Sequence, residues 1–217
     1  MKLSAQQRLL VFIAAAFVID YLPIINLPFL WSETFFHEIS HGLMALLTGG
    51  AIHNIRLNFN GSGVCTSSGG IRFLVSFSGY AGSALWGFLI YSIANSLSRS
   101  RAKFLVAAIA IMLAITLLLW ARNLSTIVIL IVLLLMYIIP LYKPGLISLK
   151  FFIQLVAIFV MLDAIRSPLY LLDGRAIGDG ANLAHLTWLP EIFWVGIWFT
   201  IAVICLYFLW RQSARTR

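Results

Sequence analysis

Long apolar runs along almost the whole chain restrict its fold more than any other feature. The runs are Leu9–Leu22, Phe29–Leu47, Phe73–Leu97, Phe104–Ala121, Leu124–Tyr142, Leu146–Ile165 and Trp188–Trp210. Most reach the roughly 20 residues with which an α-helix crosses about 30 Å of hydrocarbon. Because lipid offers the backbone no hydrogen bonds, such runs form helices, and they lack the alternation of β-barrel strands. We predict one all-α polytopic membrane domain over residues 1–217, with about six to seven transmembrane helices.

Composition and charge support the same class. The chain is 62% hydrophobic and 10% charged, with a mean hydropathy of +1.00, whereas soluble domains are about a quarter charged. The net charge of +8 comes from basic residues at the ends of the runs, as in "SRSRAK" and "RQSARTR", where cytoplasmic anchors belong. We expect a multi-pass protein of a bacterial inner membrane that contacts lipid and no nucleic acid. The first run is not expected to be a cleaved signal, and the isolated Cys65 and Cys205 indicate no disulfide framework.

Two segments interrupt the apolar pattern. Within residues 49–73, apolar and polar side chains alternate from Ile55 to Phe59, and Asn60-Gly61 supplies turn chemistry. We predict a small β-hairpin or re-entrant β loop here. Residues 166–190 are expected to form a loop with short helical pieces.

The run Phe29–Leu47 contains His37-Glu38-Ile39-Ser40-His41, which matches H-E-x-x-H. On a helix, residues i and i+4 share a face, so both imidazoles can bind one zinc ion. Glu38 lies beside that face and can take a proton from a zinc-bound water. Ionisable groups inside a span cost several kcal/mol unless paired or ligated. The alternative is a polar cluster satisfied by hydrogen bonds alone.

Hydrolytic zinc sites usually have three protein ligands, so a third ligand is expected. Asp163 is the lead candidate because it lies in a long apolar span, although an ion pair with Arg166 would also explain it. Asp179 is the second candidate, with a helix N-cap as its alternative role. Asp173 can instead form an Asp-Gly turn. The remaining candidates are Asp20, Glu33, Glu191, His53 and His185.

Small residues recur every four positions at Gly79, Ser83 and Gly87. This small-xxx-small pattern is typical of a helix face that packs closely on another helix. Ordinary helix packing is the simpler interpretation. In the other, this span presses against the zinc helix and helps to build the cavity.

The chain resembles the site-2-protease-type intramembrane zinc metalloproteases, in particular the compact branch called peptidase M50B-like. The resemblance runs from about Phe35 to the last span. The blocks that carry it are "FFHEISHGLMALLTGGAIHNIRL", "GSGV", "SGYAGSALWG", "LDAIR" and "GDGANLAHLTWLPEIFW". It implies Zn²⁺ bound by His37 and His41, Glu38 as general base, and an intramembrane aspartate as third ligand.

The resemblance implies an intramembrane zinc endopeptidase that cleaves membrane-embedded or juxtamembrane segments of membrane proteins. In this mechanism the edge of the Ile55–Phe59 strand holds an unwound peptide by β-augmentation. The alternative function is non-catalytic: a membrane scaffold or an ion transporter that retains a structural metal site. A transporter would favour inverted repeats with broken helices in matching halves. Oligomeric state is left open.

Membrane orientation has two solutions. Seven full spans divide the 15 Lys and Arg residues seven to eight, which gives no preference. If the zinc helix and its hairpin are re-entrant, ten basic residues face the cytoplasm against five, which fits the positive-inside rule better. That solution places the site towards the outer face, whereas the resemblance implies the cytoplasmic one.

Overall fold

The computed structural model describes residues 3–98, 100–143, 148–175 and 177–215; Leu146, the predicted start of one span, lies outside them. The elements are α1 Ala5–Asp20, α2 Pro23–Leu47, β1 Ala51–Leu57, β2 Gly63–Ser68, α3 Arg72–Ser96, α4 Ala102–Leu119, α5 Leu124–Tyr142, α6 Leu149–Arg166, the 3₁₀ helix η1 Ser167–Asp173, α7 Asp179–Thr187 and α8 Glu191–Arg215. The predicted all-α polytopic membrane class with a small β-hairpin is therefore confirmed.

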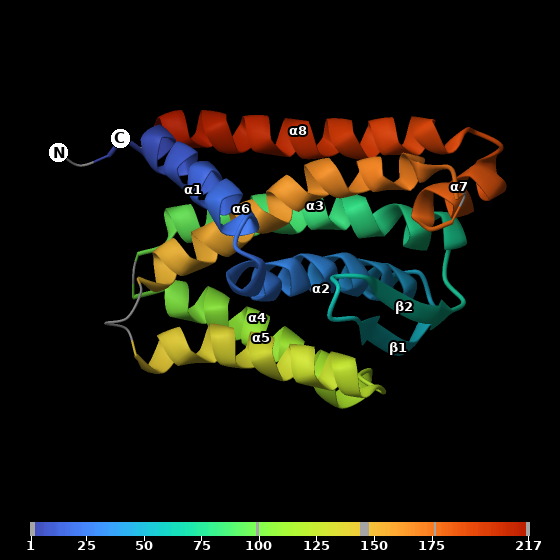
Figure 1. Ribbon diagram of the computed structural model, residues 1–217, viewed down its shortest axis with the longest axis horizontal. Coiled ribbons are helices and arrows are strands. Elements are labelled where there is room, and N and C mark those ends of the chain that lie inside the picture. The colour runs from blue at the N-terminus through green and yellow to red at the C-terminus, as the bar shows by residue number, and fades with distance from the viewer. Residues whose placement is uncertain (1–2, 99, 144–147, 176, 216–217) are drawn as a thin grey trace.

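The long helices lie roughly side by side along one axis (Figure 1). In this view α2, α3 and α6 form the middle, with the α4–α5 pair on one side and α1 and α8 on the other. The hairpin and α7 lie at one end, and both termini lie at the opposite end (Figure 1). We call these the hairpin end and the terminal end.

Five helices of the described chain are long and apolar enough to cross a membrane, and α1 with α2 makes a sixth span if that bent pair counts as one. The sequence predicts the first two apolar runs as separate spans, but the structure joins them with a bend of 115°. With 16 residues α1 is only about 24 Å long, which is too short to cross about 30 Å of hydrocarbon alone. Counted in that way, the six candidate spans agree with the lower bound of the prediction.

Polar side chains surround the break between α1 and α2. The Asn26 amide donates to the Asp20 carboxylate (3.0 Å), and Arg166 of α6 forms an ion pair with Asp20. Pro23 begins α2, where its missing N–H costs no helical hydrogen bond. This pairing compensates the charge of Asp20 and fixes the break against α6.

The strands β1 and β2 pair in antiparallel register, with Ile55 opposite Cys65 and Leu57 opposite Gly63. The hairpin also bonds to the α4–α5 connection. The N–H of Ile55 donates to the Trp120 carbonyl (3.0 Å), and the N–H of Leu57 donates to the Thr126 hydroxyl (2.7 Å). The hairpin is thus fixed to the helical core along its β1 side.

Small residues let α3 approach two helices. A Cβ at Gly87 would lie 2.9 Å from the backbone nitrogen of Met161 in α6. A Cβ at Gly79 would lie 2.5 Å from the His41 ring in α2. The predicted small-residue face of α3 therefore packs closely on α6 and, at Gly79, on the helix that carries H-E-x-x-H.

Candidate metal centre

Helix α2 carries His37, Glu38 and His41, as the sequence predicts. Both imidazoles leave the same face of the helix because the residues are four apart. Their Nε2 atoms lie 3.0 Å from each other. Two nitrogens at this separation point to a common position beside the helix.

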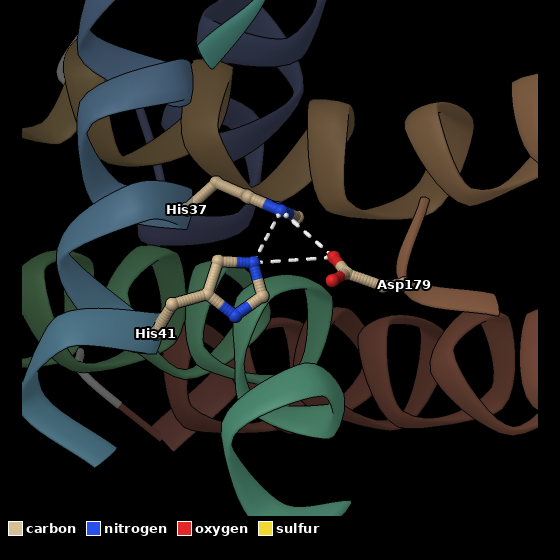
Figure 2. Close-up of side chains that lie close together, drawn as sticks. All are labelled: His37, His41 and Asp179. Carbon is tan, nitrogen blue, oxygen red and sulfur yellow. Dashed lines mark hydrogen bonds and ion pairs between the residues drawn. The ribbon is translucent and has the colours of Figure 1, made fainter. Parts of the chain in front are cut away.

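Asp179 reaches the same position from the first residue of α7. Its Oδ2 lies 3.2 Å from the Nε2 of His37 and 3.2 Å from the Nε2 of His41. Figure 2 shows the three side chains converging from α2 and from the start of α7. Gly178, with a φ of 99°, makes the turn that begins α7, and this conformation suits glycine because it has no Cβ. Asp179 is therefore the first helical residue and not the N-cap.

The donor set fits a zinc ion. All three ligand atoms lie within 4.8 Å of one another. Zn–N and Zn–O bonds near 2.0–2.2 Å in a tetrahedron place ligand atoms about 3.3 Å apart. The separations of 3.0 and 3.2 Å match that spacing. Three protein ligands also leave the fourth tetrahedral position for water or substrate, as in hydrolytic zinc sites.

The surrounding groups orient the donors. The Nδ1–H of His41 donates to the Val75 carbonyl (2.7 Å), which leaves the Nε2 lone pair facing the metal position. The His37 ring packs edge-on against Tyr80, with centroids 4.5 Å apart. Burial would raise the pKa of Asp179, but the two neighbouring imidazoles hold that pKa below its ordinary value. The carboxylate is thus ionised, as a metal ligand must be.

Glu38 is buried, with 5% of its surface exposed, and lies against β2. The backbone N–H of Cys65 donates to its carboxylate. A Cβ at Gly63 would lie 2.7 Å from the Glu38 side chain, so only glycine allows this close approach. Burial and the nearby carboxylate raise the pKa of the Cys65 thiol to about 12, so this thiol is neutral at physiological pH.

These groups line a cavity of about 470 Å³ at the hairpin end. Its walls come from α2, β2, α3, the end of α6 and the start of α7. The lining residues that matter for chemistry are His37, Glu38, His41, Tyr80, Asp163 and Asp179. Polar side chains therefore line part of a cavity inside an otherwise apolar helix bundle, with room for water beside the three donors.

Asp163, the lead candidate from the sequence, lines the cavity but does not join the three converging donors. Its carboxylate accepts a hydrogen bond from the Ser167 hydroxyl one turn later. An ion pair with Arg166, the alternative role expected for Asp163, does not account for this carboxylate either, because Arg166 pairs with Asp20. The structure thus groups the second candidate, Asp179, with the histidines, and the third ligand stays a prediction.

The other candidates lie elsewhere among the described residues. Asp173 forms the expected turn, where its carboxylate accepts from the N–H of Arg175 (2.9 Å). His53 bonds to Ser68 across the hairpin (2.7 Å). Glu191 contacts the backbone at Gly180, where an added Cβ would lie 2.6 Å from Oε1. Glu33 is buried in α2, one turn before His37.

The strand edge that faces the cavity differs from the predicted one. The N–H groups of Ile55 and Leu57 in β1 already bond to the α4–α5 connection, so that edge is not free for a peptide. In an antiparallel pair, residues opposite these two direct their backbone groups away from the partner strand. Gly63 and Cys65 are those residues, and both line the cavity. The strand edge that faces the cavity therefore belongs to β2, and the Cys65 N–H on that edge already donates to the Glu38 carboxylate.

Sequence reasoning gave no role in the site to three residues that shape it, Val75, Tyr80 and Gly63, whereas one of its two interpretations of Gly79 pressed that helix face against the zinc helix. Val75, Gly79 and Tyr80 of α3 orient the histidines, and Gly63 makes room for Glu38. The Gly79 pattern was visible as a packing signal. Nothing in the sequence marks Val75, because it acts through its backbone carbonyl.

Comparison with protein families gives one match: the model described as Peptidase M50B-like matches residues 9–209. No curated protein and no solved structure matches with significance. The matched region covers nearly the whole chain and includes His37, Glu38, His41 and Asp179. The resemblance noted from the sequence is confirmed, and the chain belongs to the Peptidase M50B-like family of membrane metallopeptidases.

Proposed function

We propose that the chain is an intramembrane zinc endopeptidase that hydrolyses peptide bonds in membrane-embedded or juxtamembrane segments of membrane proteins. His37, His41 and Asp179 hold the metal, and Glu38 is the general base. The convergence of three zinc-type donors beside a buried carboxylate, in a cavity within an apolar bundle, carries this proposal.

When bound, zinc would polarise the scissile carbonyl and lower the pKa of a water molecule. Glu38 accepts the proton of the attacking water and returns it to the leaving amine. The N–H of Cys65 holds the Glu38 carboxylate in place. The neutral thiol of Cys65 is not a competing nucleophile.

The outer edge of β2 supplies a place for the substrate backbone. A peptide bond inside a helix is hydrogen-bonded internally, so the segment must unwind before it can react. An unwound segment can pair as a third strand with the outward backbone groups of Gly63 and with the carbonyl of Cys65, whose N–H is already bonded to Glu38. Because β2 lies against Glu38, this pairing places the peptide next to the general base.

The substitution Glu38→Gln tests the role of the base. It removes the proton acceptor while keeping the size of the side chain, so we expect cleavage of a membrane-protein substrate to fall at least about 100-fold. Zinc bound per chain should stay as in wild type. An active Glu38→Gln enzyme with normal zinc content would exclude Glu38 as the base.

Zinc content in Asp179→Ala and Asp163→Ala tests the third ligand. We expect about one zinc per chain in detergent-purified wild type, as in other three-ligand sites. Asp179→Ala should lose it, whereas Asp163→Ala should keep it because Asp163 bonds to Ser167 and not to the histidines. Metal analysis by mass spectrometry measures both. Loss of zinc only in Asp163→Ala would reverse the assignment.

The ion-transport alternative has less support. Among the helices of the described chain, one pair is sharply bent, α1 with α2. An inverted-repeat transporter would need a matching broken helix in the second half. Folded wild type that contains zinc but cleaves no membrane-protein substrate would favour the structural-metal alternative.

A further inference from the structure

Six of the side chains that line the cavity carry a hydroxyl or an amide that can donate a hydrogen bond. Three of these groups already donate to acceptors in the protein: Thr34, Ser62 and Ser167. Within the described chain, the side-chain donors of the other three have no protein acceptor: Ser76, Tyr80 and Asn182. These three can donate to a group that enters the cavity.

Tyr80 of α3 differs from the other two because its ring packs on a proposed metal ligand. The ring centroids of Tyr80 and His37 lie 4.5 Å apart, with the rings nearly edge-on. The Tyr80 ring also packs against Trp198 of α8, with centroids 4.8 Å apart. The indole N–H of Trp198 donates to the Phe77 carbonyl (3.0 Å), so this support is itself fixed. The Tyr80 ring is thus held beside the metal position from two sides of the contact.

The hydroxyl of Tyr80 lies among the acidic groups of the cavity. The carboxylates of Asp179, Asp163 and Glu38 all act on it electrostatically. Among the described residues, none of these carboxylates accepts a hydrogen bond from it. A phenol keeps its proton near neutral pH, so the Tyr80 hydroxyl is a donor.

Glu38 and Tyr80 face the cavity from different walls. Glu38 lies against β2, whereas Tyr80 belongs to α3, and both β2 and α3 pack on α2. A peptide at the metal position would therefore meet the carboxylate on the β2 side and the phenol on the α3 side. A proton acceptor and a hydrogen-bond donor are the two protein groups that hydrolysis of a peptide bond can use there.

We propose that Tyr80 is a catalytic residue whose hydroxyl donates a hydrogen bond to the oxygen of the scissile carbonyl as that oxygen gains negative charge. This role rests on the proposed function. During attack, the water oxygen bonds to the carbonyl carbon, the π electron pair moves to the carbonyl oxygen, and Glu38 takes the proton. That pair then restores the carbonyl, the C–N bond breaks, and the amine nitrogen takes the proton from Glu38. Tyr80 keeps its own proton throughout.

Tyr80→Phe isolates the hydroxyl, because the ring and its contacts with His37 and Trp198 remain. A donor that binds more strongly as charge develops lowers the barrier, so we expect kcat on a membrane-protein substrate to fall about 100-fold. KM should stay as in wild type, since the bond strengthens only during the reaction. Zinc per chain should also be unchanged. Tyr170→Phe is the matched control, because Tyr170 is exposed on η1 and lies outside the cavity.

Binding of a phosphinic peptide gives a second measurement that needs no cleavage. Its phosphinate oxygens carry the negative charge that the carbonyl oxygen develops, so its affinity should follow kcat/KM. Titration of zinc-loaded protein should show about 100-fold weaker binding to Tyr80→Phe. Binding of the uncleaved substrate segment, measured in the Glu38→Gln background, should not change. Incorporation of 4-aminophenylalanine at position 80 keeps the ring and an N–H donor, and should restore part of both losses.

Equal kcat and equal phosphinate affinity in Tyr80→Phe and wild type overturn the proposal. Loss of zinc in Tyr80→Phe also overturns it, because the hydroxyl would then support the metal centre. If Tyr80→Phe does not fold, the 4-aminophenylalanine protein replaces it. The aniline N–H is a weaker donor, so kcat and phosphinate affinity should lie below wild type, and values equal to wild type overturn the proposal.

The two measurements separate this inference from the proposed function. Wild type that cleaves no membrane-protein substrate, yet binds the phosphinic peptide more tightly than Tyr80→Phe does, contradicts the proposed function and supports Tyr80 as the donor. Wild type that cleaves the substrate, with no difference between it and Tyr80→Phe, contradicts this inference alone.

Discussion

The candidate metal centre depends on the space that single residues leave as much as on its three donor residues. Gly79 shows this, because a Cβ there would lie 2.5 Å from Cε1 and Nε2 of His41 and 2.6 Å from Cε1 of His37. Real Cβ atoms do not approach so closely, and both rings are in a packed environment. Glycine at this position thus sets how far the imidazoles can extend towards α3.

Gly79→Ala should therefore displace both histidines. We expect zinc affinity to fall about 10–100-fold, the usual effect of disturbing the groups that orient metal ligands. Competition with a zinc chelator measures the affinity. Gly196→Ala in α8 is the matched control, since its Cβ would meet no atom within 4 Å. Equal zinc affinity in Gly79→Ala and wild type would show that the two imidazole rings can shift without weakening zinc binding.

At the residue scale, the sequence identified three of the proposed site residues and ranked the fourth second. The spacing of His37, Glu38 and His41 is local, so a helix alone brings them together. Asp179 lies 142 residues beyond His37, and no local pattern encodes that distance. The cost of burying a charge in the membrane favoured Asp163 as the third ligand. In the structure, the Asp163 carboxylate instead accepts a hydrogen bond from the hydroxyl of Ser167 one turn later. Arg166 likewise pairs with Asp20, 146 residues away.

At the element scale, the hairpin is held by its contacts with the α4–α5 connection. Thr126 is central, since its hydroxyl accepts from the N–H of Leu57 in β1 (2.7 Å). The Thr126 side chain is fully buried. The sequence predicted the hairpin from its alternation and turn. It could not show which edge the helices would occupy, because that depends on tertiary packing.

Thr126→Val keeps the shape of the side chain but removes the acceptor. The buried N–H of Leu57 then loses its partner, which costs about 1–3 kcal/mol. We expect a lower thermal unfolding midpoint in detergent and faster amide exchange at Leu57. Thr200→Val is the control, because the Thr200 hydroxyl bonds only to the Gly196 carbonyl of its own helix on an exposed face. An effect as large in Thr200→Val would argue against a specific role for the hairpin contact.

At the scale of the whole molecule, the proposed metal ligands connect parts of the bundle that are distant in sequence. Two of the proposed ligands come from α2 and one comes from α7. Helix α7 has nine residues and is too short to span the membrane, so only its packing holds it in place. The packing of Leu183 against Trp194 and Trp198 holds α7 to α8. The metal would add a direct link from α7 to α2.

Removal of the metal should loosen this part of the molecule alone. After chelation we expect faster hydrogen exchange in α7, while α3 and α6, whose contact is built from close helix packing, should exchange as before. Exchange measured by mass spectrometry on metal-loaded and chelated protein gives the comparison. The Asp179→Ala variant should show the hydrogen exchange of the chelated wild type, whether or not zinc is added to the solution. A general rise in exchange over all helices would instead indicate that the metal stabilises the whole fold.

The β1 edge of the hairpin is bonded to the helices and the β2 edge faces the cavity. Under the proposed function, this asymmetry sets the rules for a competitive inhibitor. Such a compound needs an extended backbone, because a helical mimic has no amides to offer β2. Along that backbone, only alternate amides face the strand. Methylation of those nitrogens should abolish inhibition, whereas methylation of the intervening ones, which point away, should be tolerated and would protect the compound from other proteases.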